Sequence, residues 1–372
     1  MGETRSSIGT PALRLGRPSL PPLDAYAQEL VGTWEGGWLS NFGPHAERFE
    51  QACSAYSGLP HVRAVSSCDV GITLAVRALG LERGARVLVP SFTFASTLHA
   101  LLWNGLEPRF ADVDPDSWCL TAESAAAALD GEMAAIVGTH AFMATCDVAG
   151  LEALAADVGA LLAFDAAQAM ASWVGGRHVG AFGDASVFSF SPTKIATCGE
   201  GGLAAFRNPA HSERFNLLRG YGSDADYDTR LVGLNGKLSE LHAALGCLTM
   251  AAIEEEVDAR LRLVDRYRER LEAVPGVRLQ ALAPDLRPTP TQLVVDFGPR
   301  RDEVASALAA RQIDTRPYFR PLHSMEHFRR LPAVPLPVTE RLGGALLALP
   351  LHRGMEDGDV DAVCDALELT LG

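Results

Sequence analysis

Lysine is nearly absent from this chain of 372 residues. Of its 32 basic residues only Lys194 and Lys237 are lysines, and the other 30 are arginines. Arginine replaces lysine adequately on a solvated surface, but it stays protonated at every ordinary pH. A chain so poor in lysine is therefore expected to keep one where a chemical step needs a neutral amine. Chance survival of either lysine on the surface is the alternative that the count leaves open.

Positive charge and long apolar runs are also scarce. The net charge is −14, and a nucleic-acid binder needs a basic face. No stretch of about 18 residues is free of charged or strongly polar side chains, as a membrane helix requires, and the first ten residues lack the apolar core of a secretory signal. The seven cysteines form no CxxC pair, which is typical of reduced thiols. We therefore predict a cytoplasmic protein with no membrane span, nucleic-acid partner or metal site.

Two different patterns divide the chain, and the length favours two domains. Between residues 60 and 206 short apolar runs alternate with helix-like stretches, which predicts a largely parallel sheet covered on both faces. We place this large α/β domain, with an N-terminal arm up to about residue 30, at residues 1–250, and a smaller α+β domain at 251–372. The strands expected in the large domain are residues 62–67, 85–92, 107–114, 134–140, 161–167, 185–191 and 201–207.

The smaller domain is expected to begin with a long amphipathic helix over residues 254–274, where apolar residues recur near a 3.6 period. Shorter elements follow the proline-rich segment APDLRPTPTQ. The strands expected there are residues 277–281, 292–297 and 314–319, and the helices are residues 301–312, 340–349 and 357–369.

Polar residues follow three of the predicted strands at the edge where open parallel sheets bind ligands. Asp165 ends LLAFD, Ser189 and Lys194 lie in SFSPTK after ASVF, and the loop SSCDVG follows VRAV and opens a helix. Each has a simpler interpretation, since Asp165 could cap a helix and Lys194 could be solvated. Together they suit pyridoxal phosphate (PLP), which needs a Schiff-base lysine, an acid on the pyridine nitrogen and donors for its phosphate. Dinucleotide binding is less favoured, because no GxGxxG follows the first strand.

At these residues the chain resembles the DegT/StrS-type aminotransferases, PLP-dependent enzymes that make amino sugars on nucleotide carriers. The motifs FDAAQA, SFSPTK followed by GEGG, and LNGKLSELHAALG occur in the family's order and spacing. The similarity runs from GGWLSNFGPHAERFE near residue 36 to LPLHRGMEDGDV near residue 360. The resemblance implies fold type I, with a three-layer, mostly parallel large domain, a smaller α+β domain, and a homodimer with shared active sites.

The resemblance also implies roles for residues that would contact the cofactor ring. Lys194 matches the Schiff-base lysine, and Asp165 matches the partner of the pyridine nitrogen. Gln168 matches the residue that hydrogen-bonds the ring hydroxyl, and Phe94 falls where an aromatic ring stacks on the cofactor.

Phosphate contacts are implied for Ser189 and for Asn235, the second reaching across the dimer interface. Lys237 takes a basic position two residues later, near phosphate or substrate. The phosphate loop departs from the family pattern, because Cys68 stands on a glycine position and Asp69 on a threonine. A carboxylate beside a phosphate dianion is unfavourable unless it points away to cap a helix amide.

Substrate contacts are implied for the segment RPYFRPLH. Tyr318, Phe319 and His323 lie in it, and Phe319 stands where the family usually has a tyrosine. The stretch HAFMATCDV also lacks the glycine usual in the family at that place. Loss of the tyrosine hydroxyl at position 319 would alter contacts with the substrate.

The reaction implied is transfer of an amino group from an amino acid, by family analogy L-glutamate, to a nucleotide-linked keto-deoxysugar. A dTDP-4-keto-6-deoxyhexose is the expected acceptor, in amino-sugar biosynthesis for a secondary metabolite or surface glycan, with the group held meanwhile as pyridoxamine phosphate. A keto-cyclitol or a 3-keto sugar is an alternative acceptor. A regulatory protein on the same fold is expected to lose Lys194 or Asp165, and both are present.

Overall fold

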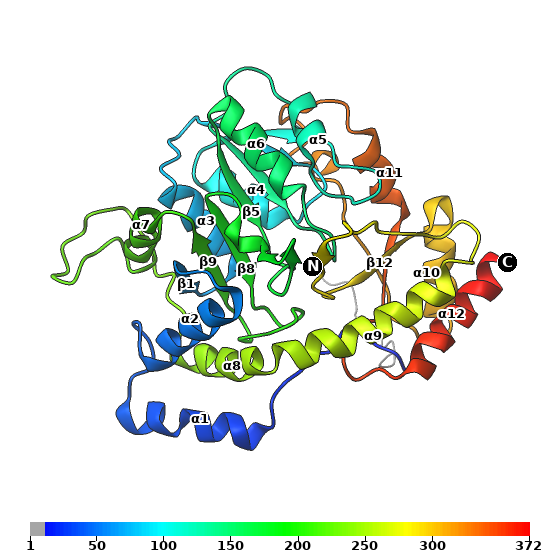
Figure 1. The fold of residues 1–372 in the computed structure, drawn as a ribbon, viewed down its shortest axis with the longest axis horizontal. Coiled ribbons are helices and arrows are strands. Elements are labelled where there is room, and N and C mark those ends of the chain that lie inside the picture. The colour runs from blue at the N-terminus through cyan, green and yellow to red at the C-terminus, as the bar shows by residue number, and fades with distance from the viewer. Residues whose placement is uncertain (1–11) are drawn as a thin grey trace, which may run out of the picture.

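The computed structural model describes residues 12–372, and two β-sheets joined by a long helix dominate it (Figure 1). The larger sheet has seven strands in the order β1-β9-β8-β5-β4-β2-β3. Strand β9 runs antiparallel to both of its neighbours, and the remaining strands run parallel to one another. The strands are β1 (Val62–Val65), β2 (Arg86–Pro90), β3 (Glu107–Ala111), β4 (Ala135–Thr139), β5 (Leu161–Asp165), β8 (Ala185–Ser189) and β9 (Gly202–Phe206).

The structure confirms the seven expected strands and the largely parallel sheet. Side chains alternate between its two faces, as the period of a strand requires. Val87 and Val89 pack in one core with α3 and α4, while Leu88 packs in another with α5 and α6. The helices of this domain are α1 (Leu23–Gly36), α2 (Pro44–Ser57), α3 (Cys68–Ala78), α4 (Ala95–Trp103), α5 (Ala122–Ala127), α6 (Val148–Val158), α7 (Pro209–Arg219) and α8 (Glu240–Ala251).

A four-stranded antiparallel sheet forms the centre of the C-terminal part, in the order β10-β12-β14-β13. The long helix α9 leads into it from α8 and packs against α12 (Figure 1). Its elements are α9 (Ile253–Leu271), β10 (Arg278–Leu279), β12 (Leu293–Asp296), α10 (Arg301–Ala309), β13 (Arg316–Pro317), α11 (Pro337–Ala345), β14 (Leu346–Leu349) and α12 (Asp357–Leu371).

The prediction of a helix over residues 340–349 is wrong for the second half of that range. Helix α11 ends at Ala345, and residues 346–349 form β14, which lies between β12 and β13. Gly343 and Gly344 weaken the helix just before this point, and Pro350 cannot continue one. All four residues of β14 are buried, so packing on both faces of the strand outweighs the helical pattern of the segment.

Contacts between distant segments connect the two parts of the chain. Leu13 of the arm pairs with Ile313 in a parallel bridge, and Leu322, Phe328 and Leu336 return to the core beside β2 and α3. A small sheet that the sequence pattern did not predict joins β6 (Trp173–Val174), β7 (Arg177–His178) and β11 (Leu286–Arg287). Short 3-10 turns lie at Val179–Ala181, Gly298–Arg300 and Leu322–Ser324.

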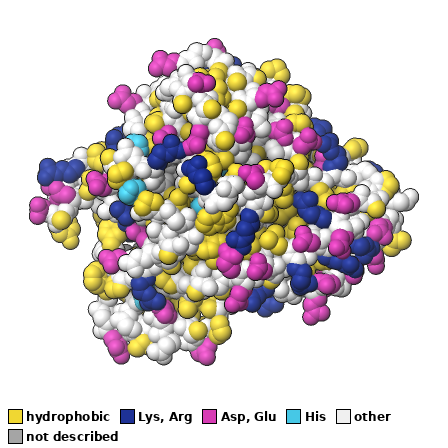
Figure 2. Space-filling model, viewed as in Figure 1, with side chains coloured by type: hydrophobic (Ala, Val, Ile, Leu, Met, Phe, Trp, Pro, Cys, Tyr) yellow, Lys and Arg dark blue, Asp and Glu magenta, His cyan; other side chains and the backbone are white. Residues whose placement is uncertain are grey.

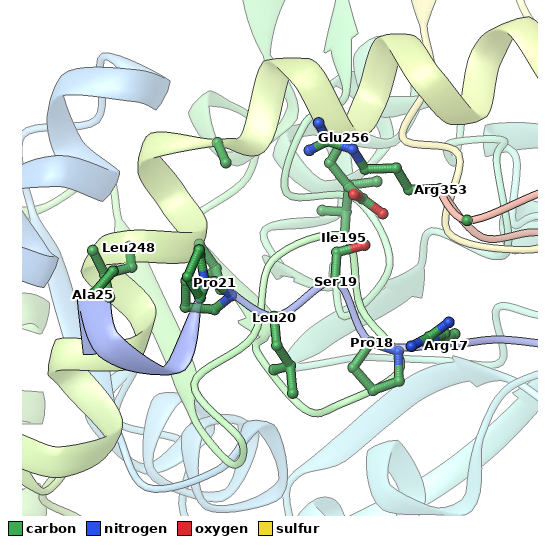
Figure 3. A pocket seen from close by; sticks show the side chains of 14 residues that line it. Arg17, Pro18, Ser19, Leu20, Pro21, Ala25, Ile195, Leu248, Glu256 and Arg353 are labelled. Atoms are coloured by element: carbon green, nitrogen blue, oxygen red, sulfur yellow. The ribbon is translucent and has the colours of Figure 1, made fainter. Parts of the chain in front are cut away.

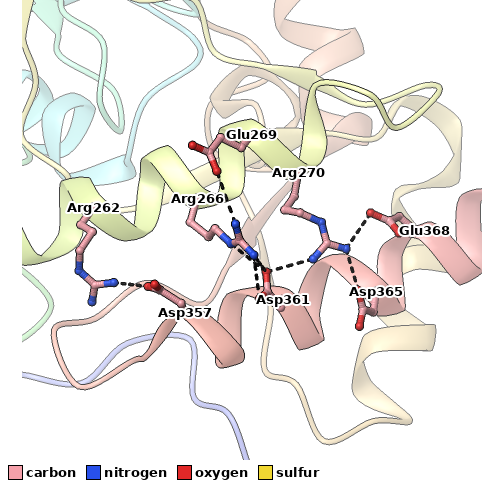
Figure 4. A network of polar contacts seen from close by, with 8 residues as sticks. All are labelled: Arg262, Arg266, Glu269, Arg270, Asp357, Asp361, Asp365 and Glu368. Atoms are coloured by element: carbon pink, nitrogen blue, oxygen red, sulfur yellow. Dashed lines mark hydrogen bonds and ion pairs between the residues drawn. The ribbon is translucent and has the colours of Figure 1, made fainter.

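A ladder of ion pairs holds α9 against α12 (Figure 4). Its arginines recur every four residues on α9 and its acids every four on α12, so each set lies along one helix face. The Arg270 guanidinium lies 3.0 Å from Asp361 and 2.7 Å from Asp365. The remaining members are Arg262, Arg266, Glu269, Asp357 and Glu368.

Acidic and basic side chains are interspersed over the face of the molecule shown in Figure 2. None of the helices within residues 12–372 has the length and apolar composition needed to cross a membrane. Within the same residues, no cluster of three histidine, cysteine or acidic side chains is arranged to hold a metal ion.

Candidate active site

The carboxyl ends of β5 and β8 and the start of α3 bring together Asp165, Lys194 and Cys68. Asp165 is the last residue of β5, Lys194 follows β8 in a loop, and Cys68 is the first residue of α3 after β1. The three are close enough for Cys68 and Asp165 each to influence the pKa of the Lys194 amine. This is the edge of the sheet at which the sequence predicts a ligand site.

Asp165 is a buried carboxylate, 4% exposed, that hydrogen bonds hold in place. The Thr97 hydroxyl donates to its Oδ2 at 2.5 Å, and the Ala167 N–H donates to its Oδ1 at 3.1 Å. Burial raises the pKa of Asp165, while these two donors and Lys194 oppose that rise. Residues 166–172 form turns and no helix, so Asp165 is not a helix cap.

Burial lowers the pKa of the Lys194 amine, although the Cys68 thiol and the Asp165 carboxylate act in the opposite direction. The shift favours a neutral amine, the form that acts as a nucleophile or base. The loop is anchored after the lysine, where the Thr249 hydroxyl donates to the Thr197 carbonyl at 2.8 Å. Lys194 is therefore a half-buried group on a loop that is anchored at Thr197.

The start of α3 offers an anion-binding position. Ser67 caps the helix, and its Oγ accepts from the Val70 N–H at 3.2 Å. Gly202 of β9 allows close packing here, since a Cβ would lie 2.8 Å from the Ser67 carbonyl. The helix dipole and free amides favour a phosphate. Asp69 is exposed, and Ser67 takes the capping role that its carboxylate could have filled.

Gln168 lies in a hydrogen-bonded chain that reaches the C-terminal part. Its Oε1 accepts from the Phe142 N–H at 2.5 Å, and its Nε2 donates to Gln292 Oε1 at 3.0 Å. The Gln292 Nε2 in turn donates to the Tyr318 hydroxyl at 3.1 Å. The structure thus connects two of the predicted site residues, Gln168 and Tyr318, through one that was not predicted.

The remaining predicted residues occupy different surroundings. Phe94 is the N-cap residue of α4, and its side chain is 61% exposed. Ser189 is buried at the end of β8. Phe319 is also buried, with its ring stacked on Phe142 at 5.1 Å, so packing rather than an open cavity surrounds it.

His323 joins the C-terminal segment to the end of β2. Its Nδ1 lies 2.8 Å from the Ser91 hydroxyl, and its Nε2 lies 3.6 Å from Glu340. These contacts fix the ring between residues of two different segments.

Asn235 and Lys237 contact each other in the loop before α8. The Lys237 amine donates to Asn235 Oδ1 at 2.7 Å and lies 3.9 Å from the centre of the Tyr221 ring. The loop runs beside the start of α3 in the same chain, where the Ser66 N–H donates to the Gly236 carbonyl at 2.8 Å. Lys237 is therefore held by contacts within its own loop, near the start of α3.

The groups at this edge fit PLP. Burying the charged Asp165 carboxylate without a full counter-charge costs free energy. A protonated pyridine nitrogen of the cofactor would supply that counter-charge. The residues that would hold the cofactor are Asp165 at the ring nitrogen, Lys194 at its aldehyde carbon, and the Ser189 hydroxyl with the first amides of α3 at its phosphate. A dianion suits that helix terminus.

Sequence reasoning missed Thr97 and Gln292. Thr97 lies three residues after Phe94, and Gln292 precedes a buried strand. Neither position has a recognisable motif, because each acts on a residue more than 60 positions away, Asp165 and Gln168 respectively.

Comparison with known proteins places the chain among aminotransferases. The model of the DegT/DnrJ/EryC1/StrS aminotransferase family matches residues 24–368. GDP-perosamine synthase of Caulobacter vibrioides is 31% identical over 360 residues, which cover 94% of this chain and 97% of the relative.

Two solved structures have the same fold over nearly their whole length. DesI, solved in the presence of its TDP-sugar product, has a TM-score of 0.91 and 34% identity, covering 98% of this chain and 94% of DesI. DesV of S. venezuelae, solved in complex with a ketimine intermediate, has a TM-score of 0.88 and 30% identity, covering 95% of this chain and 98% of DesV.

Proposed function

The chain belongs to the DegT/DnrJ/EryC1/StrS aminotransferase family and is a PLP-dependent aminotransferase, and from this premise we propose that it aminates a nucleotide-linked keto-deoxysugar. The proposed acceptor is a dTDP-4-keto-6-deoxyhexose and the proposed donor is L-glutamate, in amino-sugar biosynthesis for a secondary metabolite or surface glycan. The TDP-sugar product named for DesI supports the acceptor class. GDP-perosamine synthase supports a nucleotide sugar with a different carrier.

The proposal rests on the buried Asp165 carboxylate and the half-buried Lys194 amine at the same edge of the sheet. When bound, PLP holds the amino group between donor and acceptor and accepts the electron pair released at the substrate carbon. In the first half of the reaction the neutral Lys194 amine would take the proton from the donor carbon and pass it to the C4′ carbon of the cofactor, and in the second half it would carry a proton from C4′ to the acceptor carbon. Asp165, oriented by Thr97 and Ala167, holds the proton on the pyridine nitrogen.

The other assigned residues have proposed binding roles. Gln168 contacts the ring hydroxyl, Phe94 stacks on the ring, and Ser189 binds the phosphate with the amides of Cys68 and Asp69. The proposed sugar-binding residues are Lys237, in the loop before α8, and Tyr318, Phe319 and His323 in the segment RPYFRPLH. With Phe319 packed on Phe142, the Tyr318 hydroxyl replaces the one that position 319 lacks.

The proposal includes a homodimer in which Asn235 of one subunit binds the cofactor phosphate of the other. Apolar side chains around α4 and the loop after α7 support an interface. Trp103 is 81% exposed and Val232 is 86% exposed, and both line a cavity of about 830 Å³ that also includes Asp69. The loop after α7 extends away from the body of the chain (Figure 1). A cytoplasmic location completes the proposal, and the seven cysteines, which form no disulfide, support it.

An absorbance scan followed by a substrate panel tests the proposed function. We expect a near-visible band that borohydride abolishes, and loss of that band on adding L-glutamate. The aminated protein should then transfer the group to a dTDP-4-keto-6-deoxyhexose. Transfer only to a GDP-linked sugar would change the carrier, and transfer only to a keto-cyclitol or a 3-keto sugar would change the acceptor. Absence of the band would favour a non-catalytic protein.

Mixed dimers test the shared site. A Lys194→Ala subunit is combined with an Asn235→Ala subunit whose homodimer binds the cofactor poorly. If the sites are shared, one site of the mixed dimer pairs an intact Lys194 with an intact Asn235, and cofactor binding partly recovers there. No recovery after confirmed subunit exchange would place Asn235 in the site of its own subunit or outside both sites.

A further inference from the structure

A cavity of about 180 Å³ beside the lysine loop has lining residues from three separate parts of the chain. The N-terminal arm contributes residues 15–18, the lysine loop contributes Pro192 and Thr193, and the C-terminal part contributes Gln292, Arg316 and Tyr318, among others. Arg17 and Pro18 also line a neighbouring cavity of about 700 Å³, where the arm passes over Ile195 and Glu256 (Figure 3). The small cavity therefore lies against the arm and against Thr193, the residue before Lys194 in the chain.

The hydrogen-bonded chain from Gln168 determines which way the Tyr318 hydroxyl points its proton. The Phe142 N–H can only donate, so it identifies the atom of Gln168 it meets as Oε1. Gln168 must then donate to Gln292 through Nε2, and Gln292 must donate to the Tyr318 oxygen. Tyr318 is an acceptor in this chain, and its own proton is left for another partner. Among residues 12–372 the bond from Gln292 is the only hydrogen bond that the Tyr318 hydroxyl forms.

Two arginines bring further donors to the same cavity. Arg17 and Arg316 both line it, and neither forms a hydrogen bond or ion pair with its side chain among the described residues. A guanidinium has five N–H donors and no acceptor. Together with Tyr318, these side chains offer the cavity donors that lack acceptors.

The other charged residues of the cavity are already engaged. Arg260 contacts Glu256 at 2.6 Å, and Asp314 accepts from the Leu15 N–H at 3.3 Å. Asp314 offsets one of the two free arginines, which leaves one net positive charge. A single carboxylate balances that charge.

We propose that this cavity is the subsite for the carboxylate of the amino-acid donor, in which Arg17, Arg316 and the Tyr318 hydroxyl donate hydrogen bonds to it. Planar guanidinium groups match a carboxylate in two-point contacts. The volume of about 180 Å³ is below the range of roughly 300–1,000 Å³ typical of larger ligands. A diphosphate from the nucleotide sugar is the competing anion. This inference rests on the proposed function, because it assigns a place to the donor of that reaction.

Two measurements test the subsite. The first is the L-glutamate concentration that half-saturates loss of the cofactor band in the loaded protein, together with the rate at saturation. The second is calorimetric binding of glutarate, which has two carboxylates and no amine, and of inorganic pyrophosphate. Glutarate binding needs no turnover, so it remains informative if L-glutamate is not the donor.

We expect Arg316→Gln and Arg17→Gln each to weaken L-glutamate and glutarate binding by roughly 10-fold or more, as loss of a charged hydrogen bond does. The rate at saturation should change by less than about 3-fold, because the reacting groups are untouched. Pyrophosphate binding should not change. Arg311→Gln makes the same charge change at an exposed position on the C-terminal part and should have no effect.

Gln292→Glu tests the direction of the hydrogen bonds. A glutamate at position 292 has no N–H to donate, so the Tyr318 hydroxyl must turn its proton toward residue 292. Donor binding should weaken more than in Tyr318→Phe, because the new carboxylate at position 292 also repels the carboxylate of the donor. The loss caused by Gln292→Glu should be smaller in the Tyr318→Phe background, where no hydroxyl proton remains to be turned away. An equal loss in both backgrounds would contradict the proposed direction of the hydrogen bonds.

Three outcomes would overturn the subsite. Pyrophosphate binding could weaken in the arginine variants while glutarate binding does not, which would assign the cavity to the diphosphate. The arginine variants could bind both glutarate and pyrophosphate as tightly as the wild type does, which would show that neither arginine contacts these anions. The saturating rate could fall while binding is unchanged, which would place the arginines in the chemical step. Absence of any cofactor band, by contrast, would contradict the proposed function itself.

Discussion

Acidic and basic side chains influence one another in this chain under two different conditions, largely desolvated at the end of β5 and exposed between α9 and α12. In the buried region, desolvation raises the pKa of Asp165 and lowers the pKa of Lys194. In the exposed ladder, the hydrogen bond from Arg266 lowers the pKa of Asp361. Burial thus favours the neutral forms, whereas contact in water favours the charged forms.

This difference separates chemistry from assembly. A lysine that is proposed to act as a base must be able to give up its proton, and burial shifts the pKa of Lys194 in that direction. The arginines of the ladder never need to lose a proton. Solvent screens most of the attraction between them and the acidic residues of α12. Between the extremes lies the Glu256–Arg260 pair, which is buried and charged at a distance of 2.6 Å.

Replacing Lys194 should have the largest effect. Lys194→Ala is expected to abolish both half-reactions, since no other residue supplies both the amine and the proton transfer. Lys194→Arg should fail equally, because a guanidinium stays protonated. Single-turnover assays measure the loss, and circular dichroism should show an intact fold. Full turnover by either variant would refute the assignment.

Asp165→Asn should lower kcat by about 100-fold or more while some cofactor stays bound. The amide cannot hold the proton on the ring nitrogen, although it retains the shape that Thr97 contacts. Steady-state kinetics and the cofactor content of the pure protein are the measurements. A kcat within a few-fold of wild type would mean that the partner of the ring nitrogen lies elsewhere.

Arg260→Ala tests the intermediate case and should destabilise the protein by about 3–5 kcal/mol, because it leaves Glu256 buried without its counter-charge. Urea unfolding measures the change. Replacing both residues together, as Glu256→Leu with Arg260→Met, should recover much of the loss. If the double variant is as unstable as Arg260→Ala, the cost is lost packing rather than an unpaired charge.

The lowered pKa of Lys194 predicts a pH dependence. Its amine is neutral in a larger fraction of molecules at a given pH than an ordinary lysine, so cofactor addition to the apo-protein should reach its maximal rate at lower pH. Asp165→Asn removes a charge that raises this pKa, and the profile should move further toward acid. The rate at which the absorbance band appears, followed across pH, gives the pH dependence for the wild type and for Asp165→Asn. A shift toward alkaline pH in the variant would contradict the proposed coupling.

The smallest effect is expected in the ladder. Asp361→Asn should lower the midpoint of thermal unfolding only slightly, and the difference should shrink as salt is added. Because the pKa of Asp361 is lowered in the folded protein, its contribution is present above the ordinary carboxylate pKa of about 3.9 and is lost as the pH falls below it. A large, salt-independent loss would show that the ladder resembles the buried pair.

The sequence alone determined the main architecture and identified Asp165 and Lys194, the two residues for which we propose roles in the reaction. Apolar runs joined by helices identified all seven strands of the large sheet, because a strand buried on both faces needs a continuous apolar run. Asp165 and Lys194 were found because strand ends meet at one edge of a parallel sheet. The local sequence was sufficient for the strands and for these two residues, because a buried strand and its end can both be recognised from neighbouring residues.

Tertiary structure decided the features that depend on distant partners. Residues 346–349 became a strand because β12 and β13 pair with them from either side, against a helical local pattern. Thr97 meets Asp165, and Gln292 links Gln168 to Tyr318, across separations of 26 to 124 residues. Arg17 joins the same region from the N-terminal arm. Hydrogen bonds and charge balance act through space, so no local pattern in the sequence could have identified these residues.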